Sequence, residues 1–279
     1  MRFGITFGQL NPRVWDEAAI AADELGFESV WLPEHLVFPV AIGGKLRADE
    51  DHPPVPPSTP IYDVAAYLGA LAARTQRVRL GTFVYLLGIR HPFSTARAFA
   101  TLDLISGGRI ICGVGAGWLT TEWEAAGLDP STRGERLDEA IGLCRRLWVD
   151  EVIEHHGTHF DFAPVMFEPK PVQTPIPIHI GGESRRALRR AAQLGDGWLS
   201  MAHTFESAKV QLDTLSGLLD AEGRTLDALE VTIMGSCDGP GDVERWQAMG
   251  VDRLIVVPWA RSSEAIETMA DFADRFIAS

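Results

Sequence analysis

The chain has 279 residues, of which 46% are hydrophobic and 23% are charged, as in an ordinary globular protein. Its formal net charge of −13 disfavours nucleic acids and anionic membranes as partners. No apolar run approaches the ~20 residues of a membrane span. The three cysteines stand far apart and do not suggest a disulfide framework, so we expect a cytoplasmic protein.

Short apolar segments alternate with amphipathic segments eight times along the chain. The predicted strands are Phe3–Phe7, Ser29–Leu32, Val78–Leu86, Arg109–Val114, Ile176–Ile180, Gly197–Ser200, Glu230–Met234 and Arg253–Val257. The predicted helices are Trp15–Leu25, Ala66–Arg74, Pro92–Ile105, Arg136–Trp148, Ser184–Leu194, Phe205–Glu222, Val243–Met249 and Ser263–Phe276. This alternation implies an α/β protein with a parallel sheet. Eight units favour a closed (β/α)8 TIM barrel as a single domain over residues 1–279, and a doubly wound open sheet is the alternative.

Two insertions interrupt the alternation. Val37–Tyr62 follows the second strand, is rich in proline and lacks periodicity, which is typical of an active-site lid or a disordered segment. Asp150–Gln173 precedes the fifth strand and is predicted to form a hairpin. Loops that follow strands lie on the catalytic face of a barrel, and loops that follow helices lie on the opposite face. The first insertion is therefore a candidate lid, whereas the second belongs to the site only if it climbs the barrel.

A glycine-rich turn, Gly181-Gly182-Glu183-Ser184, ends the fifth strand, and a helix begins at once. The glycines let the backbone approach a ligand, and the amides and dipole of a helix N-terminus favour an anion. The alternative is a tight turn in which Ser184 only caps the helix. The barrel context favours phosphate binding, because barrels often bind phosphate at a late strand-to-helix loop.

A second glycine-rich segment, Gly113-Val114-Gly115-Ala116-Gly117-Trp118, ends the fourth strand. Its spacing is GxGxG and no helix follows directly, so a dinucleotide fingerprint is disfavoured. A loop that lets a bulky planar ring approach the backbone is the favoured interpretation. The bulky residues of segment 80–88 in the third strand either belong to the hydrophobic core or pack against such a ring. The pattern alone favours the hydrophobic core.

Glu34 and His35 follow the second strand. A histidine beside a carboxylate at this end of a barrel strand suits a general acid or proton donor, and the alternative is a structural histidine that bonds the lid. Neighbouring residues on an extended segment point to opposite sides. We therefore expect His35 to face the reacting atoms, with Glu34 as a structural or secondary partner.

Two other features of the sequence do not indicate a metal site or a catalytic nucleophile. His155, His156 and His159 match no metal-ligand spacing, so a solvated hairpin is favoured and no metal site is predicted. Ser184 lies in no nucleophile elbow, which leaves nucleophilic hydrolysis without support.

Several segments together resemble the luciferase-like monooxygenase superfamily, and within it the branch that depends on coenzyme F420. These segments are residues 21–31, 34–35, 80–84, 99–109, 113–118, 180–184 and 195–198. Each is a weak signal alone, but their order and spacing over nearly the whole chain are specific.

The resemblance implies a homodimeric TIM barrel whose cofactor ring lies against the C-terminal ends of the strands. It implies a non-prolyl cis peptide between Phe83 and Val84, behind the ring, and it places His35 near the reactive carbon. The cofactor-binding residues that it implies are Phe83, Val84, Gly115, Ala116, Gly117, Trp118, Gly181, Gly182, Glu183 and Ser184.

One residue departs from the pattern of the resemblance. The F420-dependent sugar-phosphate dehydrogenases carry a catalytic glutamate directly after the GxGxG glycines, where this chain has Trp118. A large apolar ring cannot act as acid or base and would narrow the pocket. A more apolar substrate than a sugar phosphate is therefore expected.

The expected function is that of an F420-dependent oxidoreductase that transfers a hydride between the deazaflavin and a small organic substrate. The alternative is a monooxygenase that uses reduced FMN and O₂. A third reading, a non-catalytic barrel that serves as a binding protein, is disfavoured by the intact glycine loops. F420 is favoured by the GxGxG pattern and by the arginines beside the strand 5 turn, which suit an anionic cofactor tail: Arg185, Arg186, Arg189 and Arg190.

Overall fold

The computed structural model describes residues 1–45 and 55–277. Its barrel strands are β1 (Arg2–Thr6), β2 (Ser29–Leu32), β3 (Arg79–Thr82), β4 (Ile110–Val114), β7 (Ile178–Gly181), β8 (Gly197–Ala202), β9 (Glu230–Met234) and β10 (Arg253–Val256). They form a closed barrel in the order β1-β10-β9-β8-β7-β4-β3-β2, and every pair is parallel. The predicted TIM barrel is confirmed, and the open sheet is excluded.

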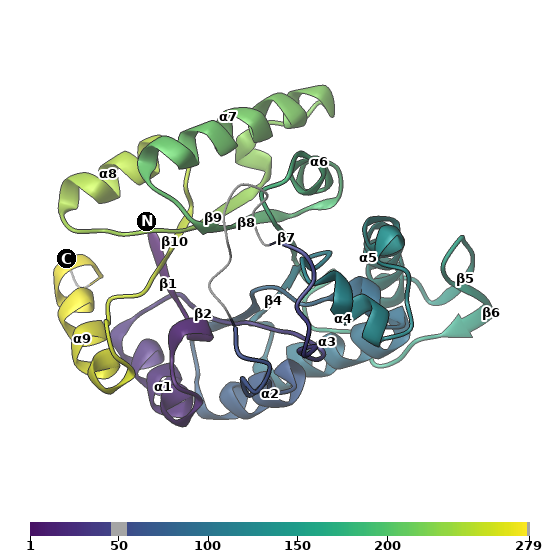
Figure 1. Cartoon of the computed structure of the whole chain (residues 1–279), viewed down its shortest axis with the longest axis horizontal. Coiled ribbons are helices and arrows are strands. Elements are labelled where there is room, and N and C mark those ends of the chain that lie inside the picture. The colour runs from purple at the N-terminus through teal and green to yellow at the C-terminus, as the bar shows by residue number, and fades with distance from the viewer. Residues whose placement is uncertain (46–54, 278–279) are drawn as a thin grey trace.

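A ring of helices surrounds the barrel (Figure 1). The helices that follow the strands are α1 (Trp15–Leu25), α2 (Val64–Arg74), α3 (Pro92–Ser106), α5 (Arg133–Val149), α6 (Arg185–Leu194), α7 (Phe205–Ala221), α8 (Pro240–Ala248) and α9 (Ala265–Phe276). The α1 helix ends at Gly26 in the left-handed conformation, with a φ of 84°, as the sequence predicts. No helix in the described part of the chain is both long and apolar enough to cross a bilayer.

A large aromatic side chain fills the inside of the barrel. Trp31 on β2 is fully buried and packs with Ile111, Leu199 and Ile255 from three other strands. A Cβ atom at Gly81, beside it on β3, would collide with the indole ring. The barrel interior is therefore a packed core, and glycine at position 81 makes room for its largest member.

A charged network closes the end of the barrel where the strands begin. The fully buried Arg253 guanidinium donates to Glu28 at 2.6 and 2.7 Å and also pairs with Glu230. Arg2 donates to the second oxygen of Glu230 at 2.6 Å. Burial, opposed in part by Glu230, lowers the pKa of His179 to about 3, so this ring stays neutral at physiological pH.

The third strand is shorter than predicted. It ends at Thr82 rather than Leu86, and the peptide bond between Phe83 and Val84, just after the strand, is cis. A single bridge joins Tyr85 to Val114 further along. The cis bond lies where the family resemblance implied it.

A short helix, α4 (Thr120–Ala125), follows β4 and was not predicted. Helices of this length are marginal without tertiary packing, so the local sequence alone gives little signal. Here the packing comes from Glu122 and Trp123, which are both fully buried.

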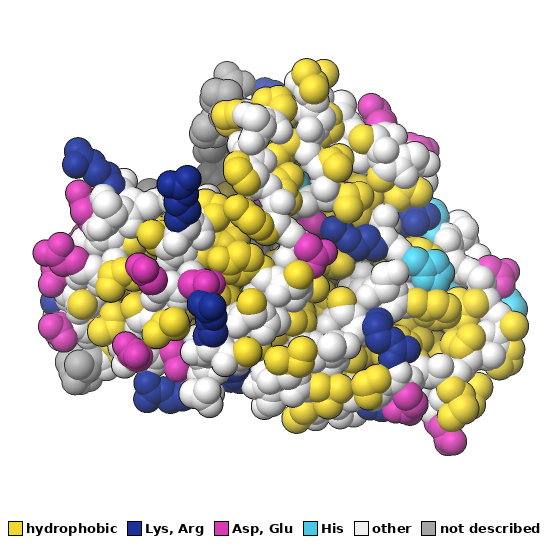
Figure 2. All heavy atoms as spheres, turned by 90° about the horizontal axis from the view of Figure 1, so that it is seen from below, with side chains coloured by type: hydrophobic (Ala, Val, Ile, Leu, Met, Phe, Trp, Pro, Cys, Tyr) yellow, Lys and Arg dark blue, Asp and Glu magenta, His cyan; other side chains and the backbone are white. Residues whose placement is uncertain are grey.

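The second insertion forms the predicted hairpin, from β5 (Val152–His156) and β6 (Asp161–Met166). Its tip climbs along the outside of the helices: Phe160 packs edge-on against His91, the N-cap of α3, at 5.6 Å, and lies under the Arg136 guanidinium. Val152 and Met166 of the hairpin are exposed, and Figure 2 shows hydrophobic side chains at the end of the molecule where Figure 1 places β5 and β6. The hairpin thus reaches the level of the catalytic face, but outside the ring of helices.

The predicted lid is described only in part, since residues 46–54 of it lie outside the described residues. Its first arm is fixed to α4: the Thr120 amide donates to the Gly43 carbonyl at 2.9 Å, and the Gly43 amide donates to Thr121 Oγ1 at 3.1 Å. At its far end, Tyr62 packs edge-on against Trp15.

Candidate active site

The residues singled out from the sequence meet at one end of the barrel. Glu34 and His35 follow β2, Val84 follows β3, and the two glycine-rich segments end β4 and β7. Because the strands are parallel, all of these positions lie at the C-terminal face, where barrel enzymes place their chemistry.

The side chain of Val84 lies between the two glycine-rich segments. A Cβ at Gly115 would stand 2.5 Å from one Val84 methyl carbon, and a Cβ at Gly181 would stand 2.5 Å from the other. These glycines are thus needed for packing around the cis peptide Phe83–Val84. Phe83 and Val84 are half-buried and pack on the barrel-interior cluster of Trp31.

The turn after β7 already uses part of its backbone. The Gly182 amide, at a φ of 114°, donates to the Leu199 carbonyl at 3.3 Å, and the Gly182 carbonyl accepts from Trp198 Nε1 at 2.9 Å. Ser184 caps α6 by accepting from the Ala187 amide at 3.2 Å. The first amides of α6 have no acceptor inside the helix, which leaves them, rather than Gly182, as the donors for an anion.

Glu183 contacts the end of β8 and the loop that follows it. One of its oxygens accepts from the Met201 amide at 2.9 Å and lies 3.0 Å from Nε2 of His203. The His203 side chain is buried, and its Nδ1 lies 3.0 Å from Ser207 Oγ. The geometry therefore ties Glu183 to the β8 loop.

The segment after β4 bends sharply at Gly117, which has a φ of 75°. A Cβ there would lie 3.0 Å from Leu86 in the loop after β3 and 3.3 Å from the buried indole nitrogen of Trp123. Ala116 is half-buried against the core. This segment thus packs tightly between the β3 loop and α4.

Glu34 is bound to the loop after β3. Its carboxylate is buried, accepts from the Leu86 amide at 2.8 Å and pairs with Arg90 at 2.7 Å. The Arg90 guanidinium also covers the Tyr85 ring, 4.5 Å from its centroid. Both oxygens of Glu34 already have donors, which supports a structural role for this carboxylate.

His35 turns the other way, toward α4. Its Nδ1 lies 2.8 Å from Oε2 of Glu122, and the other oxygen of Glu122 accepts from the amides of Leu36 and Val37. Glu122 is fully buried, whereas 18% of the His35 side chain is exposed. Sequence reasoning missed Glu122, because it stands in the unpredicted helix, 87 positions from His35.

Two half-buried aromatic rings pack beside His35. Phe38 lies 4.6 Å from the imidazole between ring centroids, and Trp118 lies edge-on at 6.1 Å. Within the described part of the chain, the partners of the imidazole are thus Glu122 and these two aromatic rings. Within residues 1–45 and 55–277, no group of three or more His, Cys, Asp or Glu residues is arranged to hold a metal ion.

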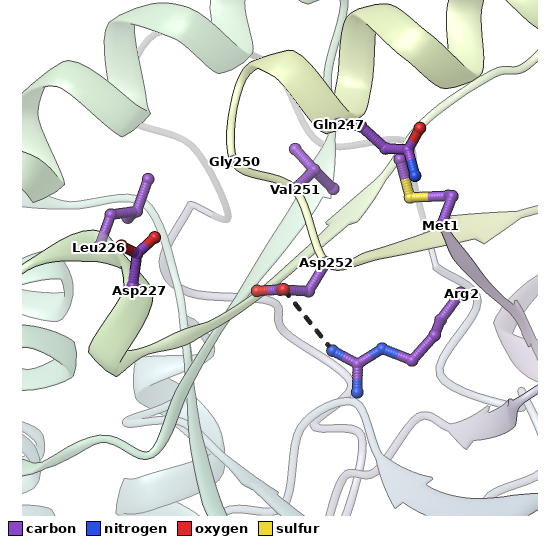
Figure 3. A pocket seen from close by; sticks show the side chains of 8 residues that line it. All are labelled: Met1, Arg2, Leu226, Asp227, Gln247, Gly250, Val251 and Asp252. Carbon is purple, nitrogen blue, oxygen red and sulfur yellow. Dashed lines mark ion pairs between the residues drawn. The ribbon is translucent and has the colours of Figure 1, made fainter.

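A cavity of about 430 Å³ lies at the opposite end of the barrel. It is lined by residues that precede β1, β9 and β10, and Figure 3 shows Arg2 facing Asp252 there, with 3.8 Å between their charged atoms. Loops at this end of a barrel serve stability, so the chemistry of the side chains, not the size of the hollow, places the candidate site.

Comparisons with known proteins identify the family of the chain. A family model described as luciferase-like monooxygenase matches residues 8–238. An F420-dependent glucose-6-phosphate dehydrogenase of Nakamurella multipartita is 34% identical over 252 residues, which cover 88% of this chain and 70% of that protein. The structure of an F420-dependent secondary alcohol dehydrogenase with an F420–acetone adduct has a TM-score of 0.79 at 18% identity, covering 99% of this chain and 98% of that one. A monooxygenase from Streptomyces bottropensis has a TM-score of 0.75 at 24% identity, covering 100% of this chain and 99% of that one.

Proposed function

Because this chain belongs to the luciferase-like monooxygenase family, we propose that it is an F420-dependent oxidoreductase acting on a small, fairly apolar substrate. The observation that carries the proposal is the placement of both His35 and the cis peptide Phe83–Val84 at the C-terminal face of the barrel. The relative from Nakamurella multipartita, which is named as F420-dependent, supports this choice of cofactor.

The residues at this face fit a planar cofactor that carries a phosphate. Phe83 and Val84 offer an apolar surface for the ring, and Gly115 and Gly181 leave room for that surface beside them. The N-terminus of α6, capped by Ser184, offers amides to a phosphate. Exposed arginines on the same helix, Arg185, Arg186 and Arg189, suit an anionic tail.

The deazaflavin of F420 supplies a carbon that accepts or releases a hydride. The protein then has to orient the substrate and manage the proton that accompanies the hydride. His35 is the group proposed to exchange that proton with the substrate or to stabilise charge near it, since imidazole is suited to both roles near neutral pH. Glu34 holds the β3 loop in place and does not need to react.

The surroundings of His35 support an apolar substrate. Trp118 and Phe38 place aromatic rings beside the imidazole, and neither side chain can serve as an acid or a base. Glucose 6-phosphate, the substrate in the name of the relative, is thus a poor match, and a small alcohol or carbonyl compound is a better one.

An FMN-dependent monooxygenase is the second candidate. A structural neighbour, 24% identical, is a monooxygenase, and a phosphate cradle of this kind serves either cofactor. A homodimer and a cytoplasmic location, both expected from the sequence, stay predictions.

Turnover under controlled oxygen separates the two candidates. Reduced F420 is mixed anaerobically with the protein and a panel of small ketones, aldehydes and enones, and F420 oxidation is followed by absorbance. Our proposal predicts enzyme-dependent oxidation that oxygen does not accelerate. Product formation only with reduced FMN and O₂ would favour the monooxygenase instead.

A further inference from the structure

We infer that Glu122 is a positioning residue that fixes the tautomer of His35. It has no proposed contact with substrate or cofactor and acts through the imidazole. The consequence for turnover rests on the proposed role of His35, but the tautomer itself does not.

The contacts of Glu122 determine which ring nitrogen of His35 carries the hydrogen. Oε1 accepts two backbone amides, from Leu36 and Val37, and Oε2 faces Nδ1 of His35 at 2.8 Å. The side chain of Glu122 is fully buried. The oxygens of a buried carboxylate need hydrogen-bond donors. The amides of Leu36 and Val37 are two such donors, and Nδ1 of His35 is the third if it carries the hydrogen.

This arrangement fixes which ring nitrogen reacts. In neutral imidazole one nitrogen is a donor and the other an acceptor, and the partner of the donor decides the tautomer. A hydrogen on Nδ1 of His35 leaves Nε2 with the lone pair. When the ring takes up a second proton, Nδ1 keeps its bond to Glu122. Nε2 is therefore the atom that accepts and releases the proton in either direction of the reaction.

The first turn of α4 holds the same loop at a second point. Thr120 and Thr121 bind the backbone of Gly43, eight positions after His35. Glu122 binds the beginning of the segment and the threonines bind its later part. The histidine is thus oriented from both its ring and its following backbone.

Glu122→Gln is the informative variant, because it keeps the shape of the side chain. The amide oxygen still accepts from Leu36 and Val37, but the NH₂ group then faces Nδ1 and donates to it. The variant should therefore force hydrogen onto Nε2 of His35. We expect ¹⁵N NMR of the cofactor-free protein to show the Nδ1–H tautomer in the wild type and the Nε2–H tautomer in Glu122→Gln, with His35→Ala identifying the signal.

In turnover assays, Glu122→Gln should lower kcat at least tenfold while the Kd for F420 stays within twofold. Glu124→Gln removes the same charge from an exposed position of the same helix and should change neither kcat nor the tautomer. In a His35→Ala background, Glu122→Gln should cause no further loss, because its effect passes through the imidazole.

Two results would overturn the inference. One is an Nε2–H tautomer for His35 in the wild-type protein, which needs no variant and no cofactor. The other is an equal loss of kcat from Glu122→Gln with and without His35. If instead the tautomers are as expected but His35→Ala is fully active, the inference about Glu122 stands and the proposed role of His35 fails.

Discussion

Glu34 and His35 are adjacent in the chain, yet their side chains are bound to different parts of the barrel. Glu34 is held by Leu86 and Arg90 in the loop after β3, and His35 by Glu122 in α4. Opposite directions for neighbours on an extended segment follow from strand geometry. The loop after β2 is thus fixed to both of the next two strand-to-helix connections.

His35→Ala tests the proposed proton-handling group. General acid–base help is typically worth ~10²–10⁴ in rate, so kcat should fall by about that factor. The Kd for F420 should stay nearly unchanged, since the proposed phosphate donors lie on α6. The matched control is His156→Ala, an exposed histidine of the hairpin. Lost cofactor affinity with normal turnover per bound cofactor would make His35 a binding residue instead.

The sequence could predict His35 but not its partner. A histidine after a barrel strand is visible from the strand pattern alone. Glu122 lies 87 positions away in a helix of six residues, where no periodic pattern exists to reveal it. The role of Gly115 and Gly181 was similarly hidden, because the sequence cannot show that Val84 fills the space beside them.

These contacts change how the glycine turn must be tested. A Gly181→Val substitution does not test phosphate binding alone, because its side chain would displace Val84. Any loss of cofactor affinity would then mix packing with binding. Substitutions of the exposed arginines on α6 avoid this problem.

The β5–β6 hairpin is fixed to the helices by its tip. Phe160 is buried against His91 and Arg136, and the Arg136 guanidinium also donates to the Gly88 carbonyl at 3.0 Å. The hairpin is thus connected through one arginine to the 3₁₀ turn after β3. The prediction of a hairpin was correct, but its climb along α3 and α5 depends on these contacts between distant residues.

Phe160→Ala should remove this anchor. Loss of a buried phenylalanine side chain typically costs ~3–5 kcal/mol, so the free energy of unfolding should fall by about 3 kcal/mol in urea titrations. Met166→Ala on the same hairpin removes a side chain that is 64% exposed and should have almost no effect. Turnover of the folded Phe160→Ala protein should stay close to normal, since the hairpin lies outside the helix ring. Equal stability of the two variants would contradict the anchoring role.

The eightfold alternation was enough to predict the barrel, because parallel strands buried on both faces have a clear apolar signature. The charged network at the strand N-termini was not predictable, since Arg253 and Glu28 stand 225 positions apart. Closure of the barrel brings β10 and β1 together and creates this network.

Acid should destabilise the whole molecule through that network. The unfolded chain protonates His179 near its ordinary pKa of 6.5, but the folded protein does so only near 3. Burial tends to raise the pKa of Glu230, yet Arg253, His179 and Arg2 lower it to about 2. Below pH 6.5 the unfolded state therefore binds the His179 proton first, and below about 4.5 it also binds the Glu230 proton, so stability falls as pH falls.

Urea unfolding at pH 7 and pH 5 measures this effect. The wild type should lose about 2 kcal/mol between the two values, at ~1.4 kcal/mol per pH unit below 6.5. His179→Gln should lose less over the same interval, whereas His156→Gln, which changes an exposed histidine, should behave as the wild type. An identical pH dependence in His179→Gln would show that His179 is not the source.

The identity of the cofactor is tested most directly by titrating the purified protein with F420 and with FMN under the same conditions. We predict that F420 binds with a Kd at least tenfold lower than that of FMN, a difference of about 1.4 kcal/mol. Binding of FMN with equal or higher affinity would contradict F420 dependence and favour the monooxygenase.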